Sequence, residues 1–295
     1  MSEAQHPTWR DWALLLFLAS IWGTAFIFIE MSLTILPPAA LSFTRLTIAA
    51  LLVTAYAHAT GHRLPPLSDK RWISFGLLGF FGNALPFFLT PLAQTQLSSA
   101  LTGILLTLMP LSTAALAHFF AHEKMTRWKL GGFLIGFAGA VILVGPAALA
   151  DLGGPTFLAQ LAVLGAAFSY AINVILTRRT PKTDPVVLAS GALICSSILG
   201  APFGLWLLAS NDLPATIGGW GAMIWLSVVP TALATVLYVG LIARAGAGFM
   251  STVNYLVPIV ALFTGLAFGE QIGWNAYLGL VVILSGIALA RRTSA

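Results

Sequence analysis

Residues 122–144 read HEKMTRWKLGGFLIGFAGAVILV, and residues 269–290 repeat much of the pattern as GEQIGWNAYLGLVVILSGIALA. The second copy keeps one glutamate and two glycines in register but none of the basic residues. The retained pairs, each 147 positions apart, are Glu123 and Glu270, Gly132 and Gly279, and Gly139 and Gly286, whereas Lys124, Arg127 and Lys129 become Gln271, Trp274 and Ala276. A duplicated segment that loses every positive charge requires a physical reason.

The composition is that of a membrane protein. Hydrophobic residues make up 58% of the chain, charged residues only 8%, and the mean hydropathy is +0.93. Soluble domains carry about 25% charged residues, so this chain has too little charge to cover a surface that faces water. Apolar runs of roughly 20 residues, the length of a membrane helix, recur along the chain. We predict ten spans, at 12–30, 38–58, 72–91, 97–118, 129–146, 156–177, 185–208, 218–240, 247–268 and 274–290.

The basic residues indicate how these spans cross the membrane, because Lys and Arg in short loops stay in the cytoplasm. If the N-terminus is inside, 13 of the 14 basic residues fall in inside segments, and the C-terminus is inside too. These 13 are Arg10, Arg63, Lys70, Arg71, Lys124, Arg127, Lys129, Arg178, Arg179, Lys182, Arg244, Arg291 and Arg292. The segments expected outside hold no Lys or Arg, because the fourteenth basic residue, Arg45, lies inside the second span.

An odd number of spans in each half explains the lost charges. Because each half has five spans, the second half must enter the membrane upside down relative to the first. The joint at 122–129 is then inside and its copy at 269–276 is outside, so the copy keeps the packing glycines and sheds the basic residues. We therefore predict an all-α integral membrane fold with two inverted five-helix repeats, residues 1–150 and 151–295, a plan common among secondary transporters.

Several motifs resemble those of a known family. They are WGTAFIF at 22–28, LSFTRLTIAALLV at 41–53, and a Pro–x12–Glu–x8–Gly pattern that starts at Pro110. With the ten spans and the repeat, they resemble the EamA-type branch of the drug/metabolite transporter superfamily over residues 12–290. Within it the chain is similar to bacterial exporters of aromatic amino acids and methionine. The resemblance implies an inner-membrane exporter with a central cavity lined by spans 1, 3, 4, 6, 8 and 9.

Polar and aromatic residues recur between the halves on helical faces that we expect to line this cavity. At an offset of 148, Thr231 and Tyr238 in span eight take the places of Asn83 and Thr90 in span three. The alternative role for Ser, Thr and Asn is hydrogen bonding between helices. The substrate-binding candidates are Trp22, Asn83, Phe87, Thr90, Met109, Tyr170, Asn173, Thr231, Tyr238, Met250 and Asn254.

Prolines inside the spans are candidates for gating or structural roles. Each removes a backbone hydrogen bond and frees the carbonyl four residues earlier. Such carbonyls are tolerated at membrane depth where they line a wet cavity or meet a neighbour. The candidates are Pro86, Pro110, Pro230 and Pro258, of which Pro258 frees the carbonyl of Asn254. The alternative is the ordinary tolerance of membrane helices for proline.

Arg45 lies inside the second span, where a charge costs about 3 kcal/mol on insertion scales. It could pair with a substrate carboxylate. Because Pro38 is only seven residues away, roughly 10 Å along a helix, it could instead snorkel to the outer boundary or hold carbonyls and helix ends together. Its repeat position is Leu193, so symmetry does not support the first role. We favour a structural or gating role.

Two histidine pairs, His58 with His62 and His118 with His122, have the i, i+4 spacing that can present two ligands to a metal. Both pairs lie at expected inner helix ends, where histidine suits the negative end of the helix dipole. We expect no metal and no cofactor. Because Ser, His and Asp form no co-facial set, we also expect no enzymatic activity.

The side chains of the expected cavity suit a neutral solute. No acidic residue lies deep in a span, which argues against proton-coupled antiport of cationic drugs. Phosphorylated substrates would need a basic cluster, and only Arg45 is available. We expect export of neutral amphipathic metabolites, such as aromatic amino acids and methionine, by alternating access; another small metabolite or a lipophilic drug is the alternative. The expected partners are this substrate and the lipid bilayer, with no nucleic acid and with a monomer as the simplest assembly.

Overall fold

The computed structural model describes residues 7–120, 126–150, 153–210, 214 and 216–290. The first half holds α1 (Trp9–Leu33), α2 (Pro38–Ala59), α3 (Arg71–Gly79), the π-helical turn η1 (Phe80–Ala84), α4 (Leu85–Gln94), α5 (Ser99–Leu105), the 3-10 turn η2 (Leu106–Leu108), α6 (Met109–Phe120) and α7 (Arg127–Ala150). The second half holds α8 (Pro155–Arg179), α9 (Pro185–Ser210), α10 (Ile217–Ser227), the π-helical turn η3 (Val228–Leu233), α11 (Ala234–Met250), α12 (Val253–Ala267) and α13 (Trp274–Ala290).

These elements form the ten-span fold of two repeats expected from the sequence. Within the described residues, eight continuous helical segments are long and apolar enough to cross a membrane, and α12 and α13 are shorter apolar helices. The expected limits hold to within a few residues except around spans eight and nine. The eighth runs from Ile217 to Gly246 instead of ending at 240, and α12 starts at Val253 instead of 247. Gly246, with a φ of +85°, separates the two spans.

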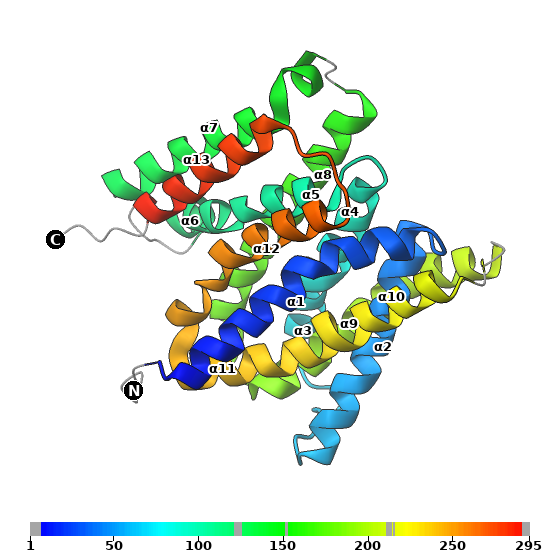
Figure 1. Ribbon diagram of the computed structural model, residues 1–295. Coiled ribbons are helices and arrows are strands. Elements are labelled where there is room, and N and C mark those ends of the chain that lie inside the picture. The colour runs from blue at the N-terminus through cyan, green and yellow to red at the C-terminus, as the bar shows by residue number, and fades with distance from the viewer. Residues whose placement is uncertain (1–6, 121–125, 151–152, 211–213, 215, 291–295) are drawn as a thin grey trace.

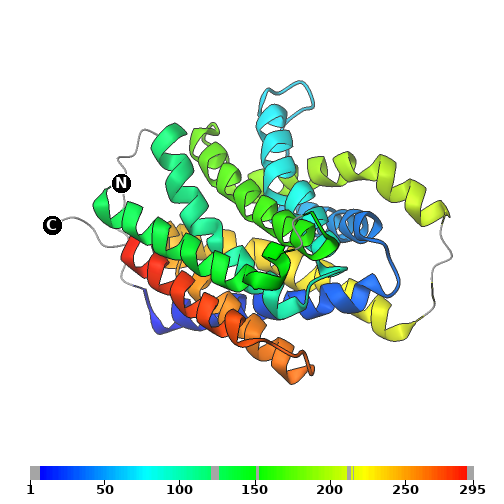
Figure 2. The ribbon, with the colours of Figure 1, turned by 90° about the horizontal axis from the view of Figure 1, so that it is seen from above.

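The glycines kept in both copies of the repeated segment pack the fifth span against the tenth. A Cβ at Gly132 would lie 2.4 Å from the carbonyl oxygen of Gly286, and one at Gly139 would lie 3.0 Å from that of Gly279. Gly132 therefore meets Gly286, the repeat equivalent of Gly139, and Gly139 meets Gly279, the repeat equivalent of Gly132. A twofold axis produces this reciprocal relation. Helices α7 and α13 lie side by side and antiparallel (Figure 1, Figure 2). The absence of side chains lets the two backbones approach closely.

The second and seventh spans, α2 and α9, are joined by hydroxyl pairs. The hydroxyl oxygens of Thr47 and Ser197 lie 2.7 Å apart, and those of Thr54 and Ser190 lie 2.8 Å apart. The later residue of α2 meets the earlier residue of α9, so these two helices are also antiparallel. Repeat-equivalent spans of the two halves thus pack against each other in opposite directions.

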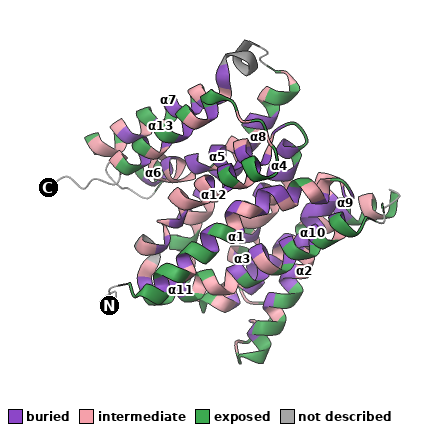
Figure 3. Ribbon diagram, in the orientation of Figure 1, coloured by how far each residue is buried: buried purple, intermediate pink, exposed green. Residues whose placement is uncertain are grey.

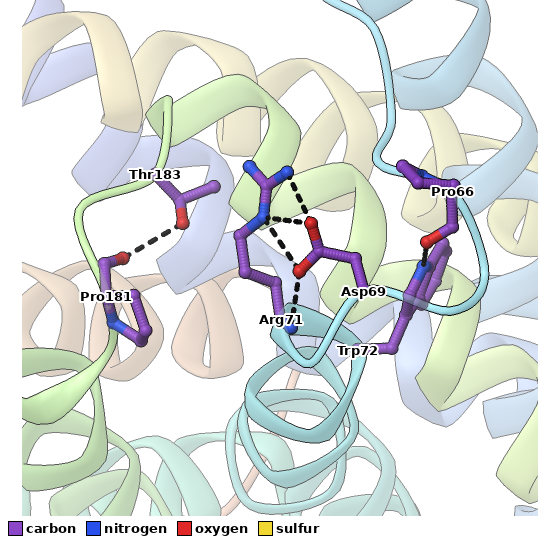
Figure 4. Close-up of polar contacts among 6 residues, drawn as sticks. All are labelled: Pro66, Asp69, Arg71, Trp72, Pro181 and Thr183. Carbon is purple, nitrogen blue, oxygen red and sulfur yellow. Dashed lines mark hydrogen bonds and ion pairs between the residues drawn. The ribbon is translucent and has the colours of Figure 1, made fainter.

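The starts of α3 and α10 repeat the same contact. Trp72 Nε1 donates to the carbonyl of Pro66 at 3.0 Å (Figure 4), and Trp220 Nε1 donates to that of Pro214 at 3.1 Å. Both residues of the second contact lie 148 positions after those of the first. A local conformation built from Pro and Trp is therefore shared by the two halves.

The charges beside these tryptophans differ between the halves. In the first half, Arg71 Nη2 lies 2.8 Å from Asp69 Oδ2 in a forked contact (Figure 4). Hydrogen bonds from Arg71 lower the pKa of the Asp69 carboxyl. In the second half, Ile217 and Gly219 take the places of Asp69 and Arg71. Conformation is kept and charge is lost at the starts of α3 and α10. Basic residues are lost in the same way between the sequences at 122–129 and 269–276.

The outer faces of the bundle are apolar. Leu51 is 67% exposed, Phe137 60% and Trp206 58%. Exposed residues follow the outer sides of the peripheral helices (Figure 3). Soluble monomers rarely expose apolar patches of this extent, so these faces contact lipid.

Ion pairs join helix ends on the side of the bundle where α1 begins. Arg244, near the end of α11, lies 3.3 Å from Asp11 in the first turn of α1. His62, after α2, lies 3.2 Å from Asp184, which precedes α9. These contacts link the two halves at that end.

Candidate functional site

The third and eighth spans depart from α-helical geometry at equivalent positions. The π-helical turns η1 and η3 start at Phe80 and Val228, 148 residues apart. Pro86 follows η1 and Pro230 lies within η3, and each removes the N–H that would bond to the carbonyl four residues earlier. Single π-helical turns inside helices often occur at functional sites. We therefore build the candidate site around these two turns.

Two serines from the second half donate to the first-half turn and its edge. Ser169 Oγ on α8 donates to the carbonyl of Phe81 at 2.7 Å. Ser196 Oγ on α9 donates to the carbonyl of Gly79 at 3.0 Å and to that of Ala192 in its own helix at 2.5 Å. Spans six and seven therefore supply donors to carbonyls in span three.

Two residues from the first half reach the second turn in the same way. Trp22 Nε1 on α1 donates to the carbonyl of Pro230 at 3.0 Å. Arg45 Nε on α2 donates to Thr231 Oγ1 at 2.7 Å, and that hydroxyl donates to the carbonyl of Leu226 at 2.6 Å. Leu226 is the residue whose carbonyl Pro230 frees, so the hydroxyl replaces the missing N–H. Spans one and two therefore donate hydrogen bonds to span eight, just as spans six and seven donate hydrogen bonds to span three.

Arg45 points into the bundle and is 6% exposed. Its guanidinium carbon lies 4.2 Å from the centroid of the Phe87 ring on α4, which is within cation–π distance. Tyr170 on α8 lies in the neighbourhood of this guanidinium. The side chain therefore does not snorkel to the outer boundary, which was one expected possibility. It links α2 to α4 and η3.

Other predicted residues lie around this centre. The rings of Trp22 and Tyr238 meet at 5.8 Å between centroids with an interplanar angle of 60°. The amide of Asn173 packs against Gly82 in η1, where a Cβ would lie 2.8 Å from its Oδ1. These contacts bring together six of the predicted substrate contacts, Trp22, Phe87, Tyr170, Asn173, Thr231 and Tyr238, as a set that we call the bulge site.

Of the remaining predicted residues, Asn83 lies within η1 itself, whereas Thr90, Met109, Met250 and Asn254 lie on α4, α6, α11 and α12. Asn83, Met109 and Asn254 are half-buried and Thr90 is buried. Met250 is 2% exposed and belongs to a hydrophobic cluster with Leu15 and Leu18, a position that suits packing. As substrate contacts, these five residues and the six of the bulge site all stay predictions.

The predicted prolines differ in their local geometry. Pro110 is the second residue of α6, which begins where the 3-10 turn η2 ends. The fourth span therefore also changes its helical pitch beside a proline. Pro258 lies inside the continuous helix α12. Three of the four predicted gating prolines, Pro86, Pro110 and Pro230, thus lie beside or within a turn that is not α-helical.

A polar cluster at the other end of the bundle escaped the sequence prediction; we call its members Glu30, Gln94, Ser99 and Glu270 the Glu270 cluster. Glu270 Oε1 accepts from the N–H of Ser99 at 2.9 Å and Oε2 accepts from that of Ala100 at 3.0 Å. Ser99 Oγ donates to Glu30 Oε2 at 2.5 Å, and Gln94 Nε2 donates to Ser99 Oγ at 3.2 Å. A carboxylate on the first N–H groups of α5 is favoured by the helix dipole. The cluster ties the loop before α13 to spans one, three and four.

Different signals were available for the residues that the prediction missed. A glutamate occurs at the same place in both copies of the opening segment, as Glu123 and Glu270, which indicated a shared role. The partners of Glu270 are main-chain N–H groups, which a pattern of side chains cannot reveal. Ser169 and Ser196 carry no signal, because serine is common wherever membrane helices touch.

The two histidines of the first pair have different neighbours. His58 Nδ1 lies 2.8 Å from the carbonyl of Thr54 in its own helix, whereas His62 contacts Asp184. His122 lies outside the described residues. Within the described part of the chain, no three His, Cys, Asp or Glu side chains group as metal ligands.

Comparisons with known proteins agree with this architecture. The EamA-like transporter family matches residues 10–145 and again residues 157–292. The transporter YvbV of Bacillus subtilis is 22% identical over 293 residues, which covers 98% of this chain and 94% of YvbV. The inner membrane transporter YedA of Escherichia coli K12 is 26% identical over 276 residues, covering 91% of this chain and 86% of YedA. A crystal structure with 21% identity covers 96% of this chain at a TM-score of 0.65 and shows the same fold.

The family match falls once on each half, and each half supplies donors to the π-helical turn of the other. Lipid-facing spans, the two-repeat fold and these relatives agree with one another. The chain is a multi-pass membrane transporter that belongs to the EamA-like transporter family.

Proposed function

We propose that this transporter exports neutral amphipathic metabolites, with aromatic amino acids and methionine among its substrates. The observation that carries the proposal is the bulge site, where aromatic side chains from four spans surround two helical irregularities. Aromatic faces offer stacking surface to an apolar or aromatic side chain. Carbonyls in irregular turns of membrane helices can bind a cation such as an ammonium group.

The proposed mechanism is alternating access. Two inverted halves can exchange inward-open and outward-open shapes around a shared site. The π-helical turns are the places where spans three and eight would bend, because helices kink where the hydrogen-bond ladder is interrupted. The Glu270 cluster would hold one end closed, and release of Glu270 from α5 would accompany opening at that end.

We propose that transport follows the substrate gradient without proton coupling. The five described acidic residues, Asp11, Glu30, Asp69, Asp184 and Glu270, lie near helix ends or in loops. Proton-coupled transporters commonly use acidic residues within the membrane. A transport rate that rises strongly with an imposed proton gradient would contradict this mechanism.

We further propose that the protein resides in the inner membrane with both termini in the cytoplasm. The support is the basic residues, which the topology places in segments on one side. The name of YedA, an inner membrane transporter, agrees with this location.

Counterflow in proteoliposomes tests the substrate class. Vesicles loaded with unlabelled phenylalanine, tryptophan or methionine should accumulate the labelled amino acid transiently, and empty vesicles should not. If none of the three exchanges while a sugar or a lipophilic cation does, amino-acid export is wrong and another metabolite or drug is the substrate.

A further inference from the structure

We propose that the guanidinium of Arg45 binds the carboxylate of the transported solute, so that the bulge site selects amphipathic carboxylates, zwitterionic amino acids included. This inference rests on the proposed function and names the substrate group that the site recognises. It goes beyond the structural or gating role that the sequence favours for Arg45.

The first step is that most N–H donors of Arg45 have no acceptor within the described part of the chain. An arginine side chain has five N–H donors, and one of them, on Nε, is directed at Thr231. The centroid of the Phe87 ring lies 4.2 Å from the guanidinium carbon, and the Nε hydrogen bond goes to Thr231 and not to this ring. Among the described residues, no atom accepts a hydrogen bond from the two Nη groups. Adjacent N–H groups on the edge of a guanidinium are those that bind a carboxylate in a forked geometry.

The second step is that no described carboxylate neutralises Arg45. Asp11 is bonded to Thr8 and lies beside Arg244, and Asp69 pairs with Arg71. The other three engage elsewhere: Asp184 with His62 and the N–H groups that start α9, Glu30 with Ser99, and Glu270 with the start of α5.

The third step is electrostatic. Ionisable side chains inside membrane segments pair with an opposite charge or mark a substrate pathway. Thr231 and Phe87 hold the guanidinium in one orientation, so a binding group would not have to order it first. A solute carboxylate would supply the missing negative charge. The half-buried rings of Phe87, Tyr170 and Trp22 would then lie beside the apolar part of the same solute.

Binding of matched ligands to purified protein tests the inference. The ligands are phenylalanine, phenylalaninamide, in which a neutral amide replaces the carboxylate, and 3-phenylpropionate, which lacks the amine. Wild-type protein should bind phenylalanine roughly tenfold to a hundredfold more tightly than the amide, the range for a hydrogen-bonded charged group. In Arg45→Gln the preference should fall to near unity, because a glutamine side chain carries no charge.

Arg63→Gln is the matched control, because Arg63 is exposed in the loop after α2 and the substitution removes the same charge. It should keep the wild-type preference. Arg45→Lys keeps the charge but loses the forked geometry, so its preference should be intermediate. If Arg45→Gln does not fold, the lysine variant and the wild-type ratio carry the test. A wild-type protein that binds phenylalanine and its amide equally, or an Arg45 variant with the full preference, overturns the inference.

3-Phenylpropionate separates this inference from the proposed function. If phenylalanine fails to bind but 3-phenylpropionate binds in a manner that depends on Arg45, amino-acid export is wrong and the carboxylate site stands. If phenylalanine exchanges in counterflow while Arg45→Gln retains the preference for carboxylates, amino-acid export stands and the assignment of Arg45 is wrong.

Discussion

Glu270 shows how a single residue can link two repeats through main-chain groups. Its two carboxylate oxygens accept from the N–H groups of Ser99 and Ala100 at the start of α5. Gly265 leaves room for this geometry, because a Cβ there would lie 2.5 Å from Glu270 Oε2. The retained glutamate of the opening segment thus has a structural explanation in the second copy, while Glu123 lies outside the described residues.

We expect Glu270→Ala to destabilise the protein, because two N–H groups of α5 lose their acceptor. Loss of a helix-capping side chain costs about 1 kcal/mol, which for a domain of 150–250 residues lowers the melting temperature by roughly 2–4 °C. Detergent-solubilised protein followed by fluorescence size-exclusion after heating measures the shift. Glu30→Gln is the control, because exposed Glu30 accepts from Ser99 Oγ alone among the described residues and the amide keeps an acceptor. Equal stability of Glu270→Ala and wild type would contradict the capping role.

The sequence predicted the aromatic members of the bulge site better than its organising contacts. Trp22, Phe87 and Tyr170 stand out because large aromatic side chains recur on helical faces. The link from Arg45 through Thr231 to Leu226 was not predictable, because it depends on the rotation of α2 against span eight. Repeat symmetry even gave a misleading indication, since Leu193 replaces Arg45, whereas the side chain that reaches the equivalent turn from α9 is Ser196.

At the scale of elements, α7 and α13 form the closest contact between repeat-equivalent helices. Gly132 and Gly139 meet Gly286 and Gly279. In a bilayer, close packing replaces the hydrophobic effect as the force between helices, so glycine at the crossing contributes directly to stability.

Adjacent glycines allow a matched test of this packing. An alanine Cβ at Gly132 would lie 2.4 Å from the carbonyl oxygen of Gly286, whereas one at Gly131 would lie 3.5 Å from Leu289 Cδ2. Gly132→Ala should therefore destabilise by about 1–3 kcal/mol, the usual cost of overpacking. Gly131→Ala should be neutral or slightly stabilising, because alanine favours helix. Thermal stability of the two variants measures the difference, and equal loss in both would show that the crossing is not the cause.

Hydropathy predicted the positions of the spans but not their internal irregularities. The turns η1 and η3 change the hydrogen-bonding pattern without changing apolarity, so no run of residues reveals them. The prolines gave a partial signal, since Pro86 follows η1 and Pro230 lies within η3, but Pro258 lies in a continuous helix. At both irregular turns a donor from the other half reaches a nearby carbonyl, since Ser169 bonds to Phe81 and Trp22 bonds to Pro230.

At the scale of the molecule, the two halves complete each other. Spans one and two donate to span eight, and spans six and seven donate to span three. Neither half alone contains both the irregular turn and its donors. We infer that relative motion of the halves must exchange or bend these hydrogen bonds, which couples the geometry of the bulge site to the shape of the whole bundle.

Labelling the two ends of one helix tests the expected orientation of this architecture. Thr34 precedes α2 and Thr60 follows it; both are exposed and each bonds through its hydroxyl to a carbonyl in the preceding turn. In a Cys195→Ala background, which removes the sole cysteine, Thr34→Cys in right-side-out vesicles should react with an impermeant maleimide. Thr60→Cys should react only after permeabilisation, because the loop after it carries Arg63, Lys70 and Arg71 and stays in the cytoplasm. The opposite pattern would place the basic loops outside and make the proposed direction of export untenable.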